Sequence, residues 1–154
     1  MSPLSARLLS ALTLLTFVVG CDGELVLKNG RPSVTWVETT PIDATTSALT
    51  LWVKDAEGEA VDVAIRWELG SQSGDIVLAP ASPPLTGLPT ELGLTLDEGQ
   101  IHRIQWDLRD VPTGALTLVL TVDDRPYKGN DGDTFRVTDL DPRADSGPLP
   151  ALRP

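Results

Sequence analysis

Acidic side chains with the chemistry of calcium ligands gather at two neighbouring points in the second half of the chain. Asp123 and Asp124 end one apolar alternation, and the run Asn130-Asp131-Gly132-Asp133 precedes the next. If these segments pair as a hairpin, their side-chain oxygens converge, from Asp123, Asp124, Asn130, Asp131 and Asp133. Calcium takes about six to eight oxygen ligands in irregular geometry, so a calcium site is one interpretation. The other is a solvated turn, which we favour because the spacing matches no EF-hand loop.

The remaining residues that could do acid–base chemistry lack suitable partners in the sequence. His102 is the only histidine, so a metal site or a catalytic triad built on it lacks parts. We expect a partly buried imidazole that is bonded to backbone. Asp55, Glu57 and Glu59 occupy an acidic turn, where they could join a metal site but need no ligand. The sequence therefore predicts a protein that is not an enzyme.

The single cysteine, Cys21, follows an apolar run from Leu8 to Val19. Arg7 is the only charged residue among residues 1–20, and the run is shorter than the roughly 20 residues that span a bilayer. This layout predicts a secretory signal over residues 1–20 that is removed after export. If the protein is exported, the thiol of Cys21 has no disulfide partner within the chain. This favours a modified cysteine over a free one.

The four residues Val18-Val19-Gly20-Cys21 resemble the lipobox of bacterial lipoproteins. The resemblance implies that the sulfur of Cys21 carries a diacylglyceryl group and that Cys21 becomes the new N-terminus. The protein would then be exported and anchored through this lipid on the periplasmic or cell-surface side of a bacterial membrane. The alternative is an ordinary cleaved signal with an incidental cysteine nearby.

Beyond the signal, apolar and polar residues alternate almost everywhere. The clearest case is the segment from Val61 to Leu69, in which every second residue is apolar, as in a strand with one wet face. Several such segments separated by turn residues predict one all-β domain over residues 33–140, an antiparallel β-sandwich of seven to eight strands without a disulfide. Residues 21–32 would form a short tether. Residues 141–154 contain four prolines and predict an extended, mobile tail.

Two longer stretches, residues 48–69 and 102–124, resemble bacterial immunoglobulin-like modules, a group that includes fibronectin-III-like and PKD-like domains. The resemblance implies an immunoglobulin-like sandwich in which Trp67 is the core tryptophan of the third strand. Two features depart from the pattern. No cysteine pair joins the sheets, and Leu116 stands where many such modules have an aromatic residue after the turn glycine.

Trp52 differs from the other tryptophans in its expected direction. Its neighbours Leu51 and Val53 are expected to face the core, which would turn Trp52 toward solvent. An exposed indole suits stacking on a sugar or contact with a protein, although a bulge or the proline-rich segment near residues 80–89 could also cover it. Trp36, Trp67 and Trp106 are expected in the core.

The chain has a formal net charge of −10, which disfavours binding to nucleic acid or to anionic lipid headgroups. We therefore expect a lipid-anchored envelope protein whose non-catalytic module binds or scaffolds another envelope or surface component. The alternative is a calcium-binding or glycan-binding module that uses the acidic loop end or Trp52.

Overall fold

The computed structural model describes residues 31–90, 99–124 and 133–154. The described residues form nine β-strands and no helix. The strands are β1 (Ser33–Pro41), β2 (Thr46–Lys54), β3 (Val61–Leu69), β4 (Gln72–Asp75), β5 (Val77–Leu78), β6 (Gln100–Asp107), β7 (Leu116–Asp124), β8 (Asp133–Leu140) and β9 (Ser146–Pro150). The predicted signal over residues 1–20 lies outside the described residues.

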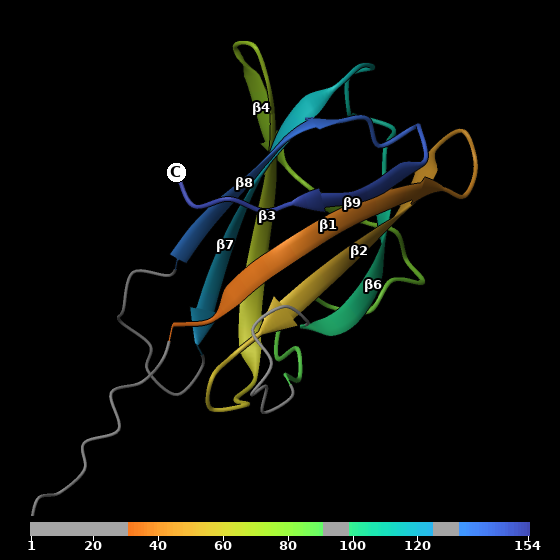
Figure 1. Ribbon diagram of the computed structural model, residues 1–154. Helices are drawn as coiled ribbons and strands as arrows, with labels where there is room; N and C mark the ends of the chain where they lie inside the picture. The colour runs from red at the N-terminus through yellow and green to blue at the C-terminus, as the bar shows by residue number, and fades with distance from the viewer. Residues whose placement is uncertain (1–30, 91–98, 125–132) are drawn as a thin grey trace, which may run out of the picture.

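The strands form two antiparallel sheets that pack face to face (Figure 1). One sheet has the order β5-β6-β2-β1-β9 and the other the order β4-β3-β7-β8. Three hairpins, β1–β2, β3–β4 and β7–β8, stay within one sheet, and the chain crosses between the sheets after β2, β4, β6 and β8. The predicted all-β, antiparallel sandwich is confirmed, with nine described strands instead of seven or eight.

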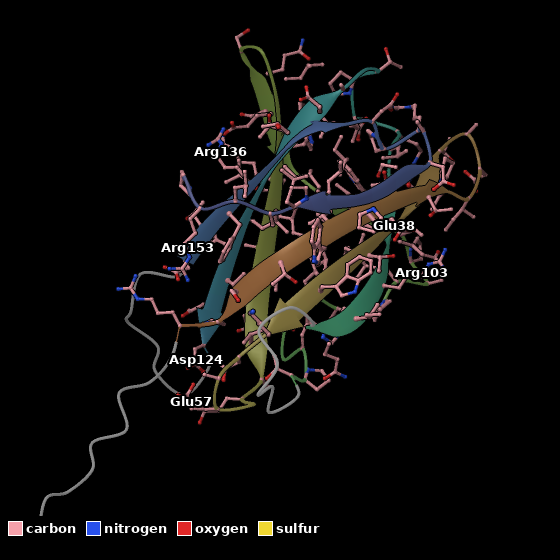
Figure 2. All side chains as sticks on the ribbon, viewed as in Figure 1. Glu38, Glu57, Arg103, Asp124, Arg136 and Arg153 are labelled. Carbon is pink, nitrogen blue, oxygen red and sulfur yellow. The ribbon has the colours of Figure 1, made fainter. Side chains whose placement is uncertain are left out.

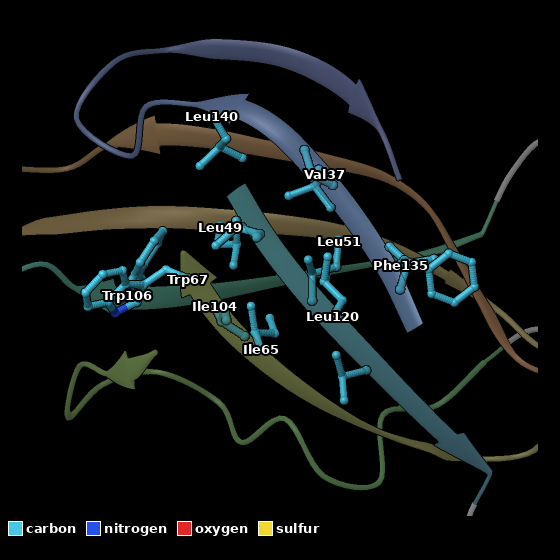
Figure 3. Close-up of a cluster of buried hydrophobic side chains, with 14 of the residues drawn as sticks. Val37, Leu49, Leu51, Ile65, Trp67, Ile104, Trp106, Leu120, Phe135 and Leu140 are labelled. Atoms are coloured by element: carbon cyan, nitrogen blue, oxygen red, sulfur yellow. The ribbon is translucent and has the colours of Figure 1, made fainter. Parts of the chain in front are cut away.

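The core lies between the two sheets and follows from the alternation (Figure 3). In β7, every second residue from Leu116 to Asp124 is buried, because successive side chains of a strand point to opposite faces. Trp106 is fully buried, and Trp67 is 9% exposed, so both take the predicted core positions. Phe135 lies at the opposite end of the cluster from these two tryptophans.

The proline-rich segment near residues 80–89 runs along the first half of β3. Val61 exchanges two backbone hydrogen bonds with Leu88, at N···O distances of 3.0 and 2.8 Å, and the N–H of Val63 donates to the carbonyl of Leu85 at 2.8 Å. Three such bonds attach the segment to the edge of the four-stranded sheet. Pro84 and Pro89 flank these residues and need no partner there, because a proline lacks the N–H that a ladder requires.

The prediction of a mobile tail over residues 141–154 is wrong for Ser146–Pro150, which form the edge strand β9. Val37 of β1 lies opposite Leu149, and the Thr39 N–H donates to the Ser146 hydroxyl at 3.0 Å. Composition suggested disorder, but an edge strand tolerates prolines that donate no hydrogen bond.

The residues after β9 also attach to the body of the protein. The Ala151 N–H donates to the Thr35 carbonyl at 3.0 Å, and Leu152 exchanges backbone hydrogen bonds with Arg136 of β8. The C-terminal segment therefore bonds to both sheets at one side of the sandwich, so the domain continues past residue 140.

Candidate functional site

The most distinctive exposed feature is a row of apolar side chains on the outer face of the five-stranded sheet. Trp36 pairs with Trp52 across β1 and β2, Trp52 pairs with Ile101 of β6, and Trp36 pairs with Pro150 of β9. We call these four residues the aromatic row. Trp36 is 37% exposed and Ile101 is 59% exposed, whereas Trp52 is half-buried. Trp52 thus points away from the core, as predicted.

Trp36 does not lie in the core, contrary to the prediction. The register of β1 against β2 shifts between Val34 and Trp36, so that Val34 and Val37 are both buried while Trp36 faces outward. A β-bulge inserts one extra residue into a strand and reverses the faces of the residues that follow. The bulge is the reason that two indoles lie side by side on the same exposed face.

A polar row lies beside the aromatic row, one step further along the strands. Glu38 pairs with Thr50, and Thr50 pairs with Arg103. Figure 2 shows Glu38 on β1 and Arg103 on β6, with β2 between them. Within the described residues, neither Glu38 nor Arg103 makes an ion pair. The outer face therefore offers stacking surfaces next to one anionic and one cationic group.

A second cluster, of carboxylates, forms where the β2–β3 turn meets the end of β7. Asp55 is 2% exposed, and its Oδ1 accepts hydrogen bonds from the backbone N–H groups of Glu57 at 2.8 Å and Glu59 at 3.3 Å. Burial raises the pKa of Asp55, and the charges of Glu57 and Asp124 raise it further. Burial and the charge of Asp124 also raise the pKa of Glu59. Figure 2 shows Asp124 and Glu57 at this end of the sandwich.

The structure divides the residues of the predicted calcium set. Asp133 forms ion pairs with Arg31 at 3.0 Å and with Arg153 at 2.7 Å. Arg153 also lies over the ring of Phe135, 5.5 Å from its centroid.

Asp124 instead lies beside Asp55 and Glu59, and Asp123 is paired with Asp62 in the β3–β7 ladder. Asn130 and Asp131 lie outside the described residues. Over residues 31–90, 99–124 and 133–154, no three acidic, histidine or cysteine side chains are placed so that they could hold a metal ion. The calcium site stays a prediction.

His102 takes the position expected of a structural histidine. Its Nε2 lies 2.9 Å from the carbonyl oxygen of Pro89, and the ring is partly buried. Burial lowers the pKa of His102, against the opposing effect of the hydrogen bond to Pro89. The imidazole therefore connects β6 to the proline-rich segment through this hydrogen bond.

Sequence reasoning missed one residue with a large structural role, Arg143. Its Nη1 donates to the carbonyl of Pro112 at 3.0 Å, and its Nη2 donates to the carbonyls of Leu108 at 2.9 Å and Val111 at 2.8 Å. The guanidinium therefore satisfies three carbonyls in the β6–β7 connection. Nothing in the local sequence around Arg143 signals this role, because all three partners lie more than 30 positions away.

Cys21, the predicted lipidation site, lies outside the described residues. The part of the chain that the structure describes has no helix with the length and apolar character of a membrane span. Comparison of the chain with protein-family models, curated proteins and solved structures finds no match in any of the three.

Proposed function

We propose that this chain is an exported, lipid-anchored protein of a bacterial envelope whose non-catalytic sandwich binds or scaffolds another envelope or surface component. One observation carries the binding part, the aromatic row on the outer face of the five-stranded sheet. Exposed tryptophans are costly to leave in water and are enriched at recognition surfaces. The anchor rests on the resemblance of Val18-Val19-Gly20-Cys21 to a lipobox.

Mass spectrometry of the protein from a bacterial host tests the anchor. We expect an N-terminal peptide that begins at Cys21 and carries the mass of a diacylglyceryl group and an acyl chain. A Cys21→Ser variant should move from the membrane fraction to the soluble fraction, because stable anchoring takes more than one buried chain. An unacylated N-terminus, with residues 1–20 attached or with cleavage elsewhere, would contradict the proposal.

Capture of cross-linked partners from intact cells tests the binding part. Trp52→Ala and Trp36→Ala should each reduce what is captured, because each removes a stacking surface from the aromatic row. Thr121→Ala is the matched control, since Thr121 lies outside the core on β7 of the other sheet. Equal capture by all three variants would show that the outer face does not bind.

A glycan is the second candidate for the partner, and the pairing of Trp36 with Trp52 favours it. Two adjacent indoles form a platform on which the apolar faces of sugar rings can stack, while Glu38, Thr50 and Arg103 offer hydrogen-bonding groups beside them. Electrophoresis through gels that contain a neutral polysaccharide should then retard the protein but not Trp52→Ala. Equal mobility with and without each polysaccharide would exclude the glycans tested.

A further inference from the structure

We propose that the outer face of the five-stranded sheet pairs with the same face of a second copy, around a two-fold axis that runs parallel to β2. This inference deepens the proposed function, since it rests on the outer face being the binding surface and names a second copy as its partner. It does not depend on the lipid anchor.

The polar row is self-complementary under such an axis. Thr50 lies on the central strand β2, with Glu38 one strand away on β1 and Arg103 one strand away on the opposite side, on β6. A two-fold axis along β2 places β1 of one copy over β6 of the other. Glu38 of each copy then faces Arg103 of the other, which forms two ion pairs from side chains that have no ion-pair partner within the described residues.

The aromatic row is matched by the same axis. Trp52 lies on β2 and therefore meets Trp52 of the second copy, while Trp36 meets Ile101. Each contact joins one apolar side chain to another, and aromatic side chains are enriched in the buried centre of protein interfaces. The same two-fold rotation thus pairs apolar side chains in the aromatic row and opposite charges in the polar row.

The charge distribution favours this face over the rest of the surface. The chain carries a formal charge of −10, so two copies repel each other in most orientations. On the outer face, by contrast, Glu38 is matched by the cation Arg103 at an outward position of β6, and Lys54 at the end of β2 lies opposite Lys54 of the second copy. Two such faces can approach without bringing uncompensated carboxylates together.

The size of the face suits a weak dimer. Four strands lie side by side, β9, β1, β2 and β6, with five, nine, nine and eight residues. Strand spacings of about 4.8 Å and rises of about 3.3 Å per residue give a face of about 490 Å². Two copies would bury at most about 980 Å² together, which is the size of a weak or transient interface.

Charge reversal tests the proposal on the full-length chain in a Cys21→Ser background, with dimer dissociation measured by sedimentation equilibrium. Glu38→Arg and Arg103→Glu should each raise the dissociation constant by about tenfold to thirtyfold, because each replaces two ion pairs by two like-charge contacts. The double variant should recover the original value to within about threefold. An equimolar mixture of the two single variants should recover it as well, since the charges match between unlike copies.

The pattern of recovery separates the proposal from its competitors. Association through residues 1–20 would be common to all variants, because none of them alters that segment. The proposal would be overturned if the Cys21→Ser protein stayed monomeric over the whole concentration range. It would also be overturned if Glu38→Arg and Arg103→Glu dimerised as tightly as the Cys21→Ser protein. A monomer that is retarded by a neutral polysaccharide would identify a glycan as the occupant and would also overturn it.

Failure of this inference can be told from failure of the proposed function. Suppose that the charge-reversal variants sediment with the same mass as the Cys21→Ser background, and that Trp52→Ala captures less partner. This result would reject the second copy and leave binding of another component in place. Charge-dependent dimers, together with a Cys21→Ser variant that stays in the membrane fraction, would support the second copy and reject the anchor.

Discussion

Trp36 lies directly opposite Trp52 in the β1–β2 pair, and the next residue, Val37, lies opposite Leu51 in the core. The two indoles are therefore held by neighbouring strands whose other faces are fully buried. Their orientation is imposed by the packing beneath them and not by contact with solvent. The two indoles are therefore a fixed part of the outer face of the sandwich.

Substitution of the exposed tryptophans should cost far less stability than substitution of the buried one. Trp106→Ala removes a fully buried indole and should lower the free energy of unfolding by about 3–5 kcal/mol. Trp36→Ala should lower it by about 1 kcal/mol, since its side chain is already partly in water. Urea denaturation followed by circular dichroism measures both. A double-mutant cycle of Trp36 and Trp52 should give a coupling of about 0.5–1.5 kcal/mol. Costs for Trp36→Ala that equal those for Trp106→Ala would show that Trp36 belongs to the core.

Asp55 should make the protein less stable as the pH rises above the ordinary pKa of a carboxyl group, about 4. Its folded-state pKa is raised, chiefly by burial, so the folded state holds a proton that the unfolded state has already lost. This contribution to stability is complete below the unfolded-state pKa and disappears as the pH rises through the folded-state pKa. Asp55→Asn should therefore be more stable than the parent at pH 7 and should show a weaker decline between pH 4 and pH 7.

Asp107 provides the opposite control. Hydrogen bonds from Arg109 lower the pKa of Asp107, so its contribution is present above the unfolded-state pKa and is lost as the pH falls below about 4. Asp107→Asn should alter the acid side of the stability profile and leave the decline between pH 4 and pH 7 in place. The same decline in Asp55→Asn as in the parent would contradict the role assigned to Asp55.

Loss of the Arg143 guanidinium should destabilise the sandwich, because three carbonyls of the β6–β7 connection would lose their donors. Arg143→Met should lower the free energy of unfolding by about 2 kcal/mol, in the range of hydrogen bonds to charged groups. Arg143→Lys should recover only part of this, since an ammonium cannot reproduce the planar fork. Arg109→Met is the control, and should cost less than about 1 kcal/mol because the Arg109 side chain is 71% exposed. Equal effects at the two positions would argue against the role of Arg143.

Gly99 should not tolerate a side chain. A Cβ at this position would lie 2.7 Å from the backbone carbon and oxygen of Val53, so β2 or the start of β6 would have to move. Gly99→Ala should therefore lower the melting temperature and cost about 1–3 kcal/mol. At Gly147 a Cβ meets nothing within 4 Å, so Gly147→Ala should be neutral within about 0.5 kcal/mol. Similar melting temperatures for the two variants would show that β2 yields to the added methyl group.

The all-β architecture could be predicted because its evidence is local. Every second residue from Val61 to Leu69 is apolar, and the strand that results buries that face whatever its neighbours are. Trp67 and Trp106 stand at the same alternate positions as the apolar residues of their strands, and both are in the core. His102 was also predictable, since a lone histidine on a half-buried strand commonly bonds to backbone.

The outer face and the C-terminal strand were decided by tertiary structure alone. One bulge in β1 changes the face of Trp36, and the sequence carries no sign of it because the extra residue is defined only against the partner strand. Ser146–Pro150 lack a strand-like alternation and are ordered because β1 offers an unpaired edge. Arg143 binds carbonyls that lie far away in the chain. Alternation along one strand thus determined which layers form, whereas register between strands determined which side chains meet on the surface.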